Sequence, residues 1–454
     1  MKSENKEQYH SKKTHVLVLS HQGYSFLEKI SGVIKELDWV GHCLSSRTAV
    51  NDEFNQESCL SKSRTYEVAK LFETSYFTLD STLDWGSVKE RIDWLRIEVE
   101  PEKIVVFSVW EGYRALAAKA NDYCGTSDST FHSVQSCQDK YLFRKLLKSV
   151  GLSSIDTYLI QNQESLEALK STQKRFFVKP RRGAGSINAR ELCLSDSFED
   201  LKNQQQLAKK DKTLGELVSD DYVAEEYIDG IEFAAELFVS GGLVSIVSIS
   251  EKFSVEELEG ATVEPGCISP PDHVFCNMPS VEILQFRLTK ILSILGLNAG
   301  IYHVELRAKS PEIIELIEIN PRLGGAMIDE LTACATGQSL IRLGLLALTQ
   351  SHSEAKKEHT LVRNALKRHY LESDKVHFFR VFFGKRNQKI KKIGWQNQID
   401  ARLSHLFAKQ GEKLPDSAKE IFLAQALWSL DRNSSLQMKQ VIERSQNALE
   451  VEYV

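Results

Sequence analysis

Residues 300–322, GIYHVELRAKSPEIIELIEINPR, contain two alternating apolar segments with acidic side chains inside them. The polar residues 309–312 between the segments are typical of a turn, so the sequence predicts an antiparallel hairpin. Because a strand has a period of two, Glu318 and Asn320 share one face, and the hairpin brings Glu305 within about one residue pair of them. Carboxylates gathered on a sheet face repel one another unless a cation lies among them. The pattern favours a divalent-cation site over solvated acids, with the register open by about one or two residues.

The residues around this hairpin add two further candidates. Arg322 directly follows the second strand, where a guanidinium can hold a phosphate or a carboxylate through two hydrogen bonds. His303 lies beside the predicted metal strand. It could take a proton from an amine, but a structural histidine paired across the hairpin is the favoured interpretation.

A loop of small residues follows the apolar segment RFFVKP, which ends with Lys179 and Pro180. Glycines let backbone N–H groups approach phosphate oxygens, and a lysine supplies a point charge there. The loop residues concerned are Gly183, Gly185 and Ser186. An ordinary basic turn explains the pattern equally well, and Lys140 by itself is typical of a helix surface.

Residues 225–232, EEYIDGIE, combine four acids with a strand, a turn and the start of a second strand. The backbone of a strand between two domains can bind the edge of adenine, while a carboxylate accepts from its amino group or from ribose. Taken alone, these acids are more typical of a solvated edge strand. Gly241 and Gly242, between two alternating apolar runs, predict a hairpin directly after them.

The ends of the chain have different patterns. The run VLVLS after His15 and the run KIVVFSV at 103–109 each precede a helical pattern, which predicts a parallel α/β domain over 14–130. Its first loop lacks G-x-G-x-x-G, and the chain has no P-loop or protein-kinase motif. Towards the C-terminus we expect a linker at 351–360, a strand in VHFFRVFF and a mainly helical segment at 415–454.

Composition restricts the function and the location. Subtracting 62 acidic from 57 basic side chains gives a net charge of -5, so nucleic acid is not expected as the main partner. No apolar run approaches the roughly 20 residues that span a bilayer, and residues 1–13 form a polar tail. The eight cysteines show no zinc-binding spacing, which predicts free thiols in a reducing cytoplasm.

Several of these motifs occur in an order that resembles the ATP-grasp superfamily. They are DK with an Arg four residues later, VKP with GAGS, EEYIDGIEF, and E-x-N-P-R followed by GG, over roughly residues 105–350. Within the superfamily, VWEGYRALAAKAND leading to QDK, the YHVEL hairpin and INPRLGG are most similar to the L-amino acid ligases and related carboxylate-amine ligases. The resemblance implies ATP and Mg²⁺ as cofactors, with Mn²⁺ as a substitute.

The resemblance also implies an α/β fold (α+β overall) of ATP-grasp architecture. The implied parts are a tail at 1–13, an N-terminal pre-ATP-grasp α/β domain at 14–130, an ATP-grasp domain at 131–350 with a lid at about 151–224, and a small C-terminal domain at 351–454.

Site roles carry over to the matching positions. The implied nucleotide contacts are Lys140 and Lys179 with the loop Gly183, Gly185 and Ser186 at the phosphates, Glu225 or its neighbour Glu226 at the adenine amino group, the backbone near Ile228 at the ring, and Glu232 at ribose. The implied Mg²⁺ ligands are Glu305, Glu318 and Asn320, and Arg322 would meet the transferred phosphoryl group or the substrate carboxylate.

The function implied is an ATP-dependent ligase that joins a carboxylate, of an amino acid, to an amine through an acyl phosphate. Its partners would be these two small molecules, without nucleic acid or membrane, and a homodimer is compatible with the pattern. Glu264, in the loosely similar segment 251–271, is a candidate for a place near the amine. Two alternatives stay open: a ligase with a different acceptor, such as a thiol or a specialised-metabolite amine, and an ATP-binding protein without catalysis.

Overall fold

The computed structural model describes residues 13–21, 26–46, 70–78, 80–210, 215–252, 256–258, 261–271, 281–310, 312–396, 400–416, 421–432 and 435–454. Residues 1–12 of the tail expected at 1–13 and two of the cysteines, Cys59 and Cys276, lie outside these residues. The six described cysteines are free, as the sequence predicts. Among the described helices, none is both long and apolar enough to cross a membrane.

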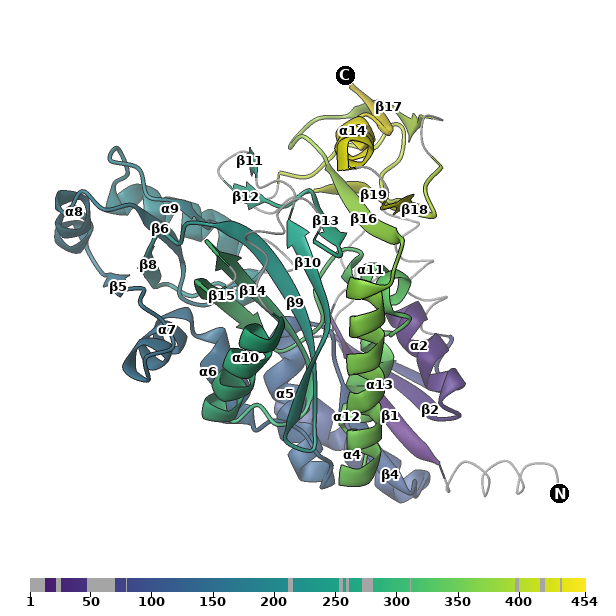
Figure 1. Cartoon of the computed structure of the whole chain (residues 1–454). Coiled ribbons are helices and arrows are strands. Elements are labelled where there is room, and N and C mark those ends of the chain that lie inside the picture. The colour runs from purple at the N-terminus through teal and green to yellow at the C-terminus, as the bar shows by residue number, and fades with distance from the viewer. Residues whose placement is uncertain are drawn as a thin grey trace.

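The N-terminal part is a parallel α/β unit, at the lower right of Figure 1. Its sheet has the order β3-β2-β1-β4, with β1 (Thr14–Ser20), β2 (Val40–Ser45), β3 (Thr74–Phe77) and β4 (Lys103–Phe107). The helices are α2 (Leu27–Glu36), α4 (Trp85–Glu98) and α5 (Glu111–Cys124). All three strand pairs are parallel, which confirms the prediction from the repeated strand-helix pattern.

A small four-stranded sheet, at the upper left of Figure 1, lies in the segment predicted to be a lid, and we use the name lid for it below. It is reached through α6 (Phe131–Gln138) and α7 (Lys140–Ser149), and its strands are β5 (Thr157–Ile160), β6 (Phe176–Pro180), β7 (Arg190–Glu191) and β8 (Tyr222–Glu226). The helical elements of the lid are α8 (Gln163–Ser171), α9 (Phe198–Lys209) and the short η1 (Gly215–Leu217). The order β5-β8-β6-β7 brings β6 and β8 side by side in antiparallel orientation, so the loop after β6 begins beside the start of β8, and Glu225 and Glu226 at the end of β8 pair with Phe177 and Phe176 at the start of β6.

The centre of the molecule is an eight-stranded sheet of order β15-β14-β9-β10-β13-β16-β19-β18. Its strands are β9 (Ile231–Ser240), β10 (Leu243–Lys252), β13 (Gly266–Ser269), β14 (Gly300–Ala308), β15 (Ile314–Asn320), β16 (Lys375–Phe383), β18 (Leu403–Leu406) and β19 (Phe422–Asp431). Both expected hairpins are present. Gly241 and Gly242 have φ values of 58° and 77°, the left-handed backbone that a two-residue hairpin turn requires.

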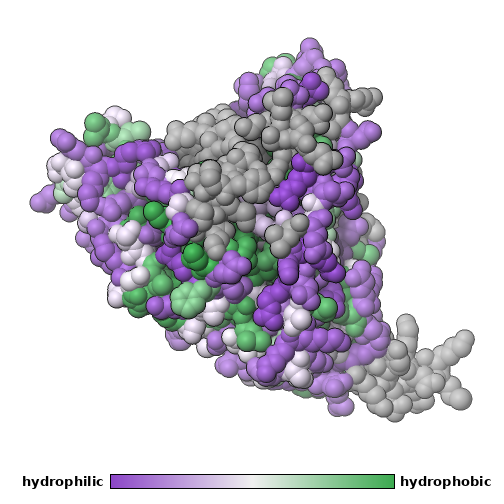
Figure 2. All heavy atoms as spheres, in the orientation of Figure 1, coloured by the Kyte–Doolittle hydropathy of each residue, from purple (hydrophilic) through white to green (hydrophobic). Residues whose placement is uncertain are grey.

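Helices cover the faces of this sheet. They are α10 (Val281–Leu295), α11 (Ile328–Thr336), α12 (Leu340–Ala347) and α13 (His352–Leu371). Buried side chains of the N-terminal sheet, such as Val105 and Phe107, share one core with Leu340 and Leu343 of α12 and Phe379 of β16. The surface in Figure 2 is mainly hydrophilic, with hydrophobic residues gathered near α10, whose Phe286 is 71% exposed.

The expected linker at 351–360 is wrong, because these residues begin α13. Ser351 caps the helix with a capping box that includes Glu354, and Ala355 and His359 are fully buried. The mainly helical reading of 415–454 is also wrong. This segment contains β19, α14 (Ser435–Ser445) and β20 (Leu449–Tyr453), and β20 pairs with β17 (Ile390–Trp395).

The remaining strands are β11 (Glu256–Leu258) and β12 (Ala261–Val263), which pair with each other. The strand expected in VHFFRVFF is β16. Because β16 and β19 continue the central sheet, the C-terminal part shares its strands with the rest of the molecule, and the domain boundary at 350 stays a prediction.

Candidate functional site

A cavity of about 110 Å³ lies between the lid and the strands β14 and β15. Eleven of the thirteen predicted site residues line it: Lys140, Lys179, Gly183, Gly185, Ser186, Glu225, Glu226, Ile228, Glu232, Glu305 and Glu318. The other two follow directly, since Asn320 ends β15 and Arg322 comes two residues later. The structure therefore brings together side chains from separate segments of the chain, while their individual roles stay predictions.

The glycine loop and two lysines form one end of the cavity. Lys179 belongs to β6, and Lys140 is the first residue of α7, where its Nζ donates to the Gly183 carbonyl at 3.0 Å. Gly185 and Ser186 have φ values of 65° and 51°. They belong to a tight turn, and a turn can direct backbone N–H groups into a concave surface suited to an anion.

Another part of the lining is apolar and suits a flat base. Ile187 from the lid and Ile317 from β15 line it, together with Tyr227 and Ile228. The carbonyl of Ile228 accepts from the Arg307 guanidinium at 2.7 Å. The backbone predicted to bind the adenine ring is therefore held by a cation of β14.

The carboxylate of Glu225 is placed differently from the expectation. It lies between two cations, 3.1 Å from Arg144 Nε and 2.8 Å from Lys179 Nζ. Burial alone would raise the pKa of Glu225, but the two cations overcome this effect and lower the pKa to about 2. Glu225 is therefore charged at neutral pH and holds Lys179, and a contact with the adenine amino group stays a prediction.

Glu226, the alternative adenine contact, points to the other side of β8. Its carboxylate forms an ion pair with Lys174 and accepts from the backbone N–H of Asp156 at 3.4 Å. Glu226 is therefore more accessible than Glu225, with a side chain that is 20% exposed.

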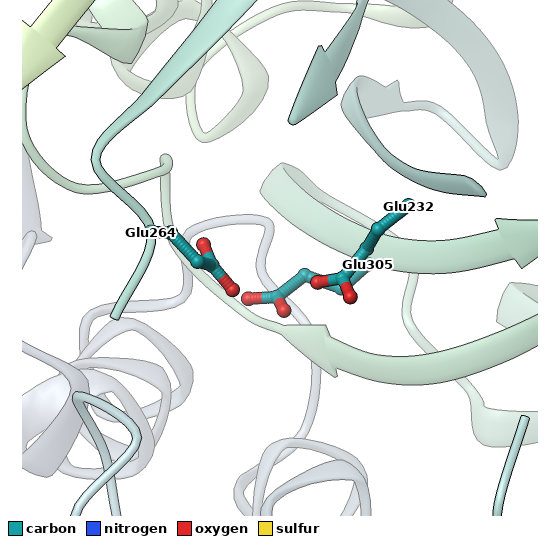
Figure 3. Close-up of side chains that lie close together, drawn as sticks. All are labelled: Glu232, Glu264 and Glu305. Carbon is teal, nitrogen blue, oxygen red and sulfur yellow. The ribbon is translucent and has the colours of Figure 1, made fainter. Parts of the chain in front are cut away.

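Lys252, the last residue of β10, lies among three carboxylates. Its Nζ is 2.6 Å from Glu232 and 2.9 Å from Glu305, and it also forms an ion pair with Glu264. Figure 3 shows the three carboxylates pointing towards one another, and their oxygens lie within 4.8 Å. Burial would lower the pKa of Lys252, but the acids raise it well above its usual value. Glu232, expected at ribose, is thus bound to Lys252 and to Arg307.

The predicted metal ligands lie on neighbouring strands in the expected hairpin. Glu305 and Glu318 are direct cross-strand partners, and Asn320 is two residues further along β15. Glu318 lies 3.4 Å from Lys140 Nζ and accepts from Asn320 Nδ2 at 2.9 Å, while the Glu305 carboxylate turns towards Lys252. These side chains offer hard oxygen donors, so their chemistry fits Mg²⁺, which would replace Lys140 and Lys252 as the partner of the carboxylates; the ligation stays a prediction.

His303 has a different partner from the one expected. Its Nδ1 is 2.5 Å from Glu236 of β9 instead of contacting a residue across the hairpin, and its Nε2 is 3.4 Å from Glu305. Burial would lower the pKa of His303, but Glu236 and then Glu305 raise it to about 10. The imidazole is therefore a charged link between two acids.

Arg322 connects the site to the N-terminal part. Its Nε and one terminal nitrogen lie 3.1 and 2.8 Å from the same oxygen of Glu111, in the first turn of α5. This contact fixes the guanidinium beside the end of β15. Binding of a phosphoryl group or a carboxylate by Arg322 stays a prediction.

Sequence reasoning assigned no role to four charged residues of the site: Lys252, Glu236, Glu111, and Arg144, which it used only as the Arg of the DK motif. Two of them carried a signal. Glu236 is an acid inside the apolar run FAAELFV, and Lys252 ends the alternating run SIVSISEK. Charged side chains in such apolar runs are buried only when they are paired. Each of these two residues therefore predicts an oppositely charged partner but does not identify it.

Residues 172–330 match the family model of the ATP-grasp domain. The chain contains an ATP-grasp domain. The matched segment begins in the lid and ends in α11, so it includes most of the residues that line the cavity.

Curated relatives cover part of the chain. The carbamoyl phosphate synthase large chain of Thermotoga neapolitana is 27% identical over 213 residues, which are 46% of this chain and 18% of that protein. The corresponding protein of Thermotoga maritima is 24% identical over 240 residues, 52% of this chain and 20% of that one. This chain therefore spans about a fifth of the length of the curated relatives it matches.

Solved structures share the fold over nearly the whole chain. An L-amino acid ligase from Bacillus licheniformis has a TM-score of 0.68 at 18% identity, covering 98% of this chain and 99% of that one. The biotin carboxylase domain of Hydrogenobacter thermophilus 2-oxoglutarate carboxylase has a TM-score of 0.64 at 14% identity, covering 98% and 92%. These likenesses confirm the mixed α/β architecture expected from the sequence.

Proposed function

We propose that this protein is an ATP- and Mg²⁺-dependent ligase that joins the carboxylate of an amino acid to an amine and releases ADP and phosphate. The observation that carries the proposal is one cavity whose lining combines lysines, a glycine loop and clustered carboxylates. Such a lining suits a nucleotide whose phosphates end beside hard oxygen ligands. The ATP-grasp match and the fold shared with an L-amino acid ligase support the same conclusion.

The proposed reaction has two steps. A carboxylate is a poor electrophile, so its oxygen first attacks the γ-phosphorus, the bond to ADP breaks and an acyl phosphate forms. The amine then attacks the acyl carbon, phosphate leaves, and the nitrogen loses a proton. Both steps depend on positioning and charge stabilisation more than on a covalent nucleophile. Mg²⁺, when bound, would neutralise charge on the β- and γ-phosphates.

The lysines suit the phosphate end of this scheme. Lys140 lies between the glycine loop and the metal residues, within 3.0 Å of the Gly183 carbonyl and 3.4 Å of Glu318. Lys179 is held by Glu225, so its ammonium is oriented before a nucleotide binds. In the proposal, these two ammonium groups bind phosphate oxygens and balance the charge of the transferring group.

The acids and Arg322 suit the substrate end. Arg322, fixed by Glu111, would bind the transferred phosphoryl group or the substrate carboxylate. Glu264 lines the cavity and binds the ammonium of Lys252, which is the contact that a substrate amine would also offer. We therefore propose Glu264 as the carboxylate nearest the amine.

The proposed cofactors, substrates and cellular location follow from the same argument. The similar biotin carboxylase domain was solved with MgADP, which supports ATP and Mg²⁺ here. We further propose Mn²⁺ as a substitute, small-molecule substrates, and a cytoplasmic location.

A screen of amino acid pairs tests the proposal. Purified protein with ATP and Mg²⁺ should release ADP and phosphate with at least one pair, and mass spectrometry should detect the amide product. Glu318→Ala should abolish turnover with the fold retained, whereas Glu312→Ala, at the exposed turn of the same hairpin, should not. Turnover with other acids alone refutes the amino acid assignment. ATP binding without turnover for any acceptor refutes the ligase, and full activity of Glu318→Ala refutes the metal assignment.

A further inference from the structure

Three side chains form a continuous line behind the predicted metal site. His303 lies in β14, and its backbone is paired with Glu236 of β9. The ring reaches Glu236 Oε1 through Nδ1 at 2.5 Å and approaches Glu305 Oε1 through Nε2 at 3.4 Å. Both ring nitrogens therefore face carboxylates, one of which belongs to a predicted Mg²⁺ ligand.

This arrangement leaves the imidazole little freedom to act as a base. His303 is 7% exposed and Glu236 is 2% exposed, so the pair lies beneath the cavity surface. A base for the amine needs a nitrogen that can reach the substrate, and here each nitrogen faces a protein oxygen. The geometry favours a role that acts through Glu305.

The other end of the line reaches the loop that follows Arg322. The second oxygen of Glu236 accepts from the backbone N–H of Gly324 at 3.3 Å. A Cβ at Gly324 would lie 2.8 Å from His303 Nδ1, so the loop backbone packs directly on the ring. The same two side chains thus contact a predicted metal ligand and the loop beside the guanidinium.

We propose that His303 is a positioning residue that orients Glu305 towards Mg²⁺ and, through Glu236, holds the Gly324 backbone. This inference rests on the proposed function, because it requires the cation to bind at Glu305. Partners that orient ligating carboxylates commonly contribute about 10- to 100-fold to metal affinity or activity. Without the imidazole, Glu305 keeps Lys252 as its partner and turns away from the metal position.

Two substitutions separate the two contacts of the ring. An Asn amide can occupy the place of Nδ1, and a Gln amide can reach the place of Nε2. His303→Asn therefore keeps the contact with Glu236 and loses the one with Glu305, whereas His303→Gln does the reverse. We expect His303→Asn to show the larger loss in metal binding.

The assay measures ADP affinity by calorimetry with and without saturating Mg²⁺, so it does not depend on turnover. In the wild type, Mg²⁺ should tighten ADP binding. In His303→Asn, this enhancement should fall by about tenfold or more, with ADP affinity in the absence of metal unchanged. In His303→Gln, more of the enhancement should remain.

His359→Asn is the matched control. His359 is also fully buried, and it contacts Ser245 and the Ser240 carbonyl far along the sheet from the cavity. Its replacement should lower stability without changing the Mg²⁺ enhancement. Should His303→Asn not fold, His303→Ala, which also loses the contact with Glu305, takes its place and should show the same loss of Mg²⁺ enhancement relative to His303→Gln and to this control.

The outcomes distinguish the two proposals. Wild-type Mg²⁺ enhancement in both His303 variants overturns the positioning role and leaves the ligase proposal intact. The positioning role is supported and the ligase is refuted if Mg²⁺ enhances ADP binding in the wild type, this enhancement is reduced in His303→Asn, and no acid or acceptor gives turnover. Absence of any Mg²⁺ effect on the wild type overturns the positioning role together with the metal site.

Discussion

Replacing Lys252 with Met removes the ammonium that lies among Glu232, Glu264 and Glu305. The Lys252 side chain is 1% exposed, and those of the acids are 8, 29 and 18% exposed. Methionine is similar in length and fits a buried site, so the substitution mainly removes charge. The three carboxylates would then face one another without this counter-ion.

The expected loss of stability follows from the burial of the group. Removing one partner of a buried ion pair typically costs about 3–5 kcal/mol, because the other charge stays buried and uncompensated. For Lys252→Met we expect a loss of this size near neutral pH. It is a large share of the roughly 5–15 kcal/mol that stabilises a typical folded protein.

The loss of stability in Lys252→Met should become larger as the pH rises. In the wild type, burial already raises the pKa of Glu264 to about 8, although Lys252 opposes this, and Lys252 helps to lower the pKa of Glu305 against the effect of burial. Without Lys252, burial and mutual repulsion should raise the pKa values of these acids further, above the roughly 4.3 of an unfolded Glu. A group whose pKa is raised by folding destabilises the fold as pH rises above its unfolded value. The difference between wild type and Lys252→Met should therefore be larger at about pH 8 than at about pH 5.

Urea unfolding followed by circular dichroism at both pH values measures this difference. Lys309→Met is the control, because Lys309 pairs with Asp229 on the surface, where both side chains are more than half exposed. It should cost less than about 1 kcal/mol. The reasoning is refuted if Lys252→Met loses no more stability than Lys309→Met, or if its loss shrinks as pH rises.

Two further predictions concern the lid. In Glu225→Gln, the carboxylate that holds Lys179 and Arg144 is lost. The pKa of Glu225 is lowered to about 2, so its contribution of about 3 kcal/mol should be present above about pH 4.3 and lost as pH falls towards 2. Comparing urea unfolding of wild type and variant over this range checks the sign, and a difference that grows in acid contradicts it. Trp110, at the start of α5, packs with Leu217 of η1 against one small apolar cluster and so joins the N-terminal part to the lid. Trp110→Ala should therefore raise the KM for ATP about tenfold and accelerate proteolysis of the lid. Unchanged values of both would contradict a role of this contact in holding the lid.

Local patterns determined which parts of the fold were predictable. The hairpins at 241–242 and 309–312 followed from alternation and turn residues, which are short-range signals. The polar composition of 352–371 hid a helix whose buried stripe includes Ala355, His359 and Val362. The capping pair Ser351 and Glu354 would have located its start.

The sequence predicted which residues belong to the site, but not which of their charged groups form ion pairs with one another. The order of motifs was enough to collect the residues around one cavity, because each motif has its own strand or loop. The partner of each charge depends on which strands become neighbours. Lys252 and Glu305 are 53 residues apart, and Arg144 and Glu225 are 81 apart, so no local pattern could pair them.

Beside the cavity, two neighbouring strands of the central sheet are paired over a short length. Strands β10 and β13 are joined by two residue pairs, Glu251 with Ile268 and Lys252 with Cys267, whereas β16 and β19 are paired along most of their length. Within the sheet, β10 is therefore joined to the C-terminal strands through these two pairs, and one of them includes the backbone of Lys252. The residue that binds the three carboxylates of the cavity is thus also part of the narrow connection between the C-terminal strands and the rest of the sheet.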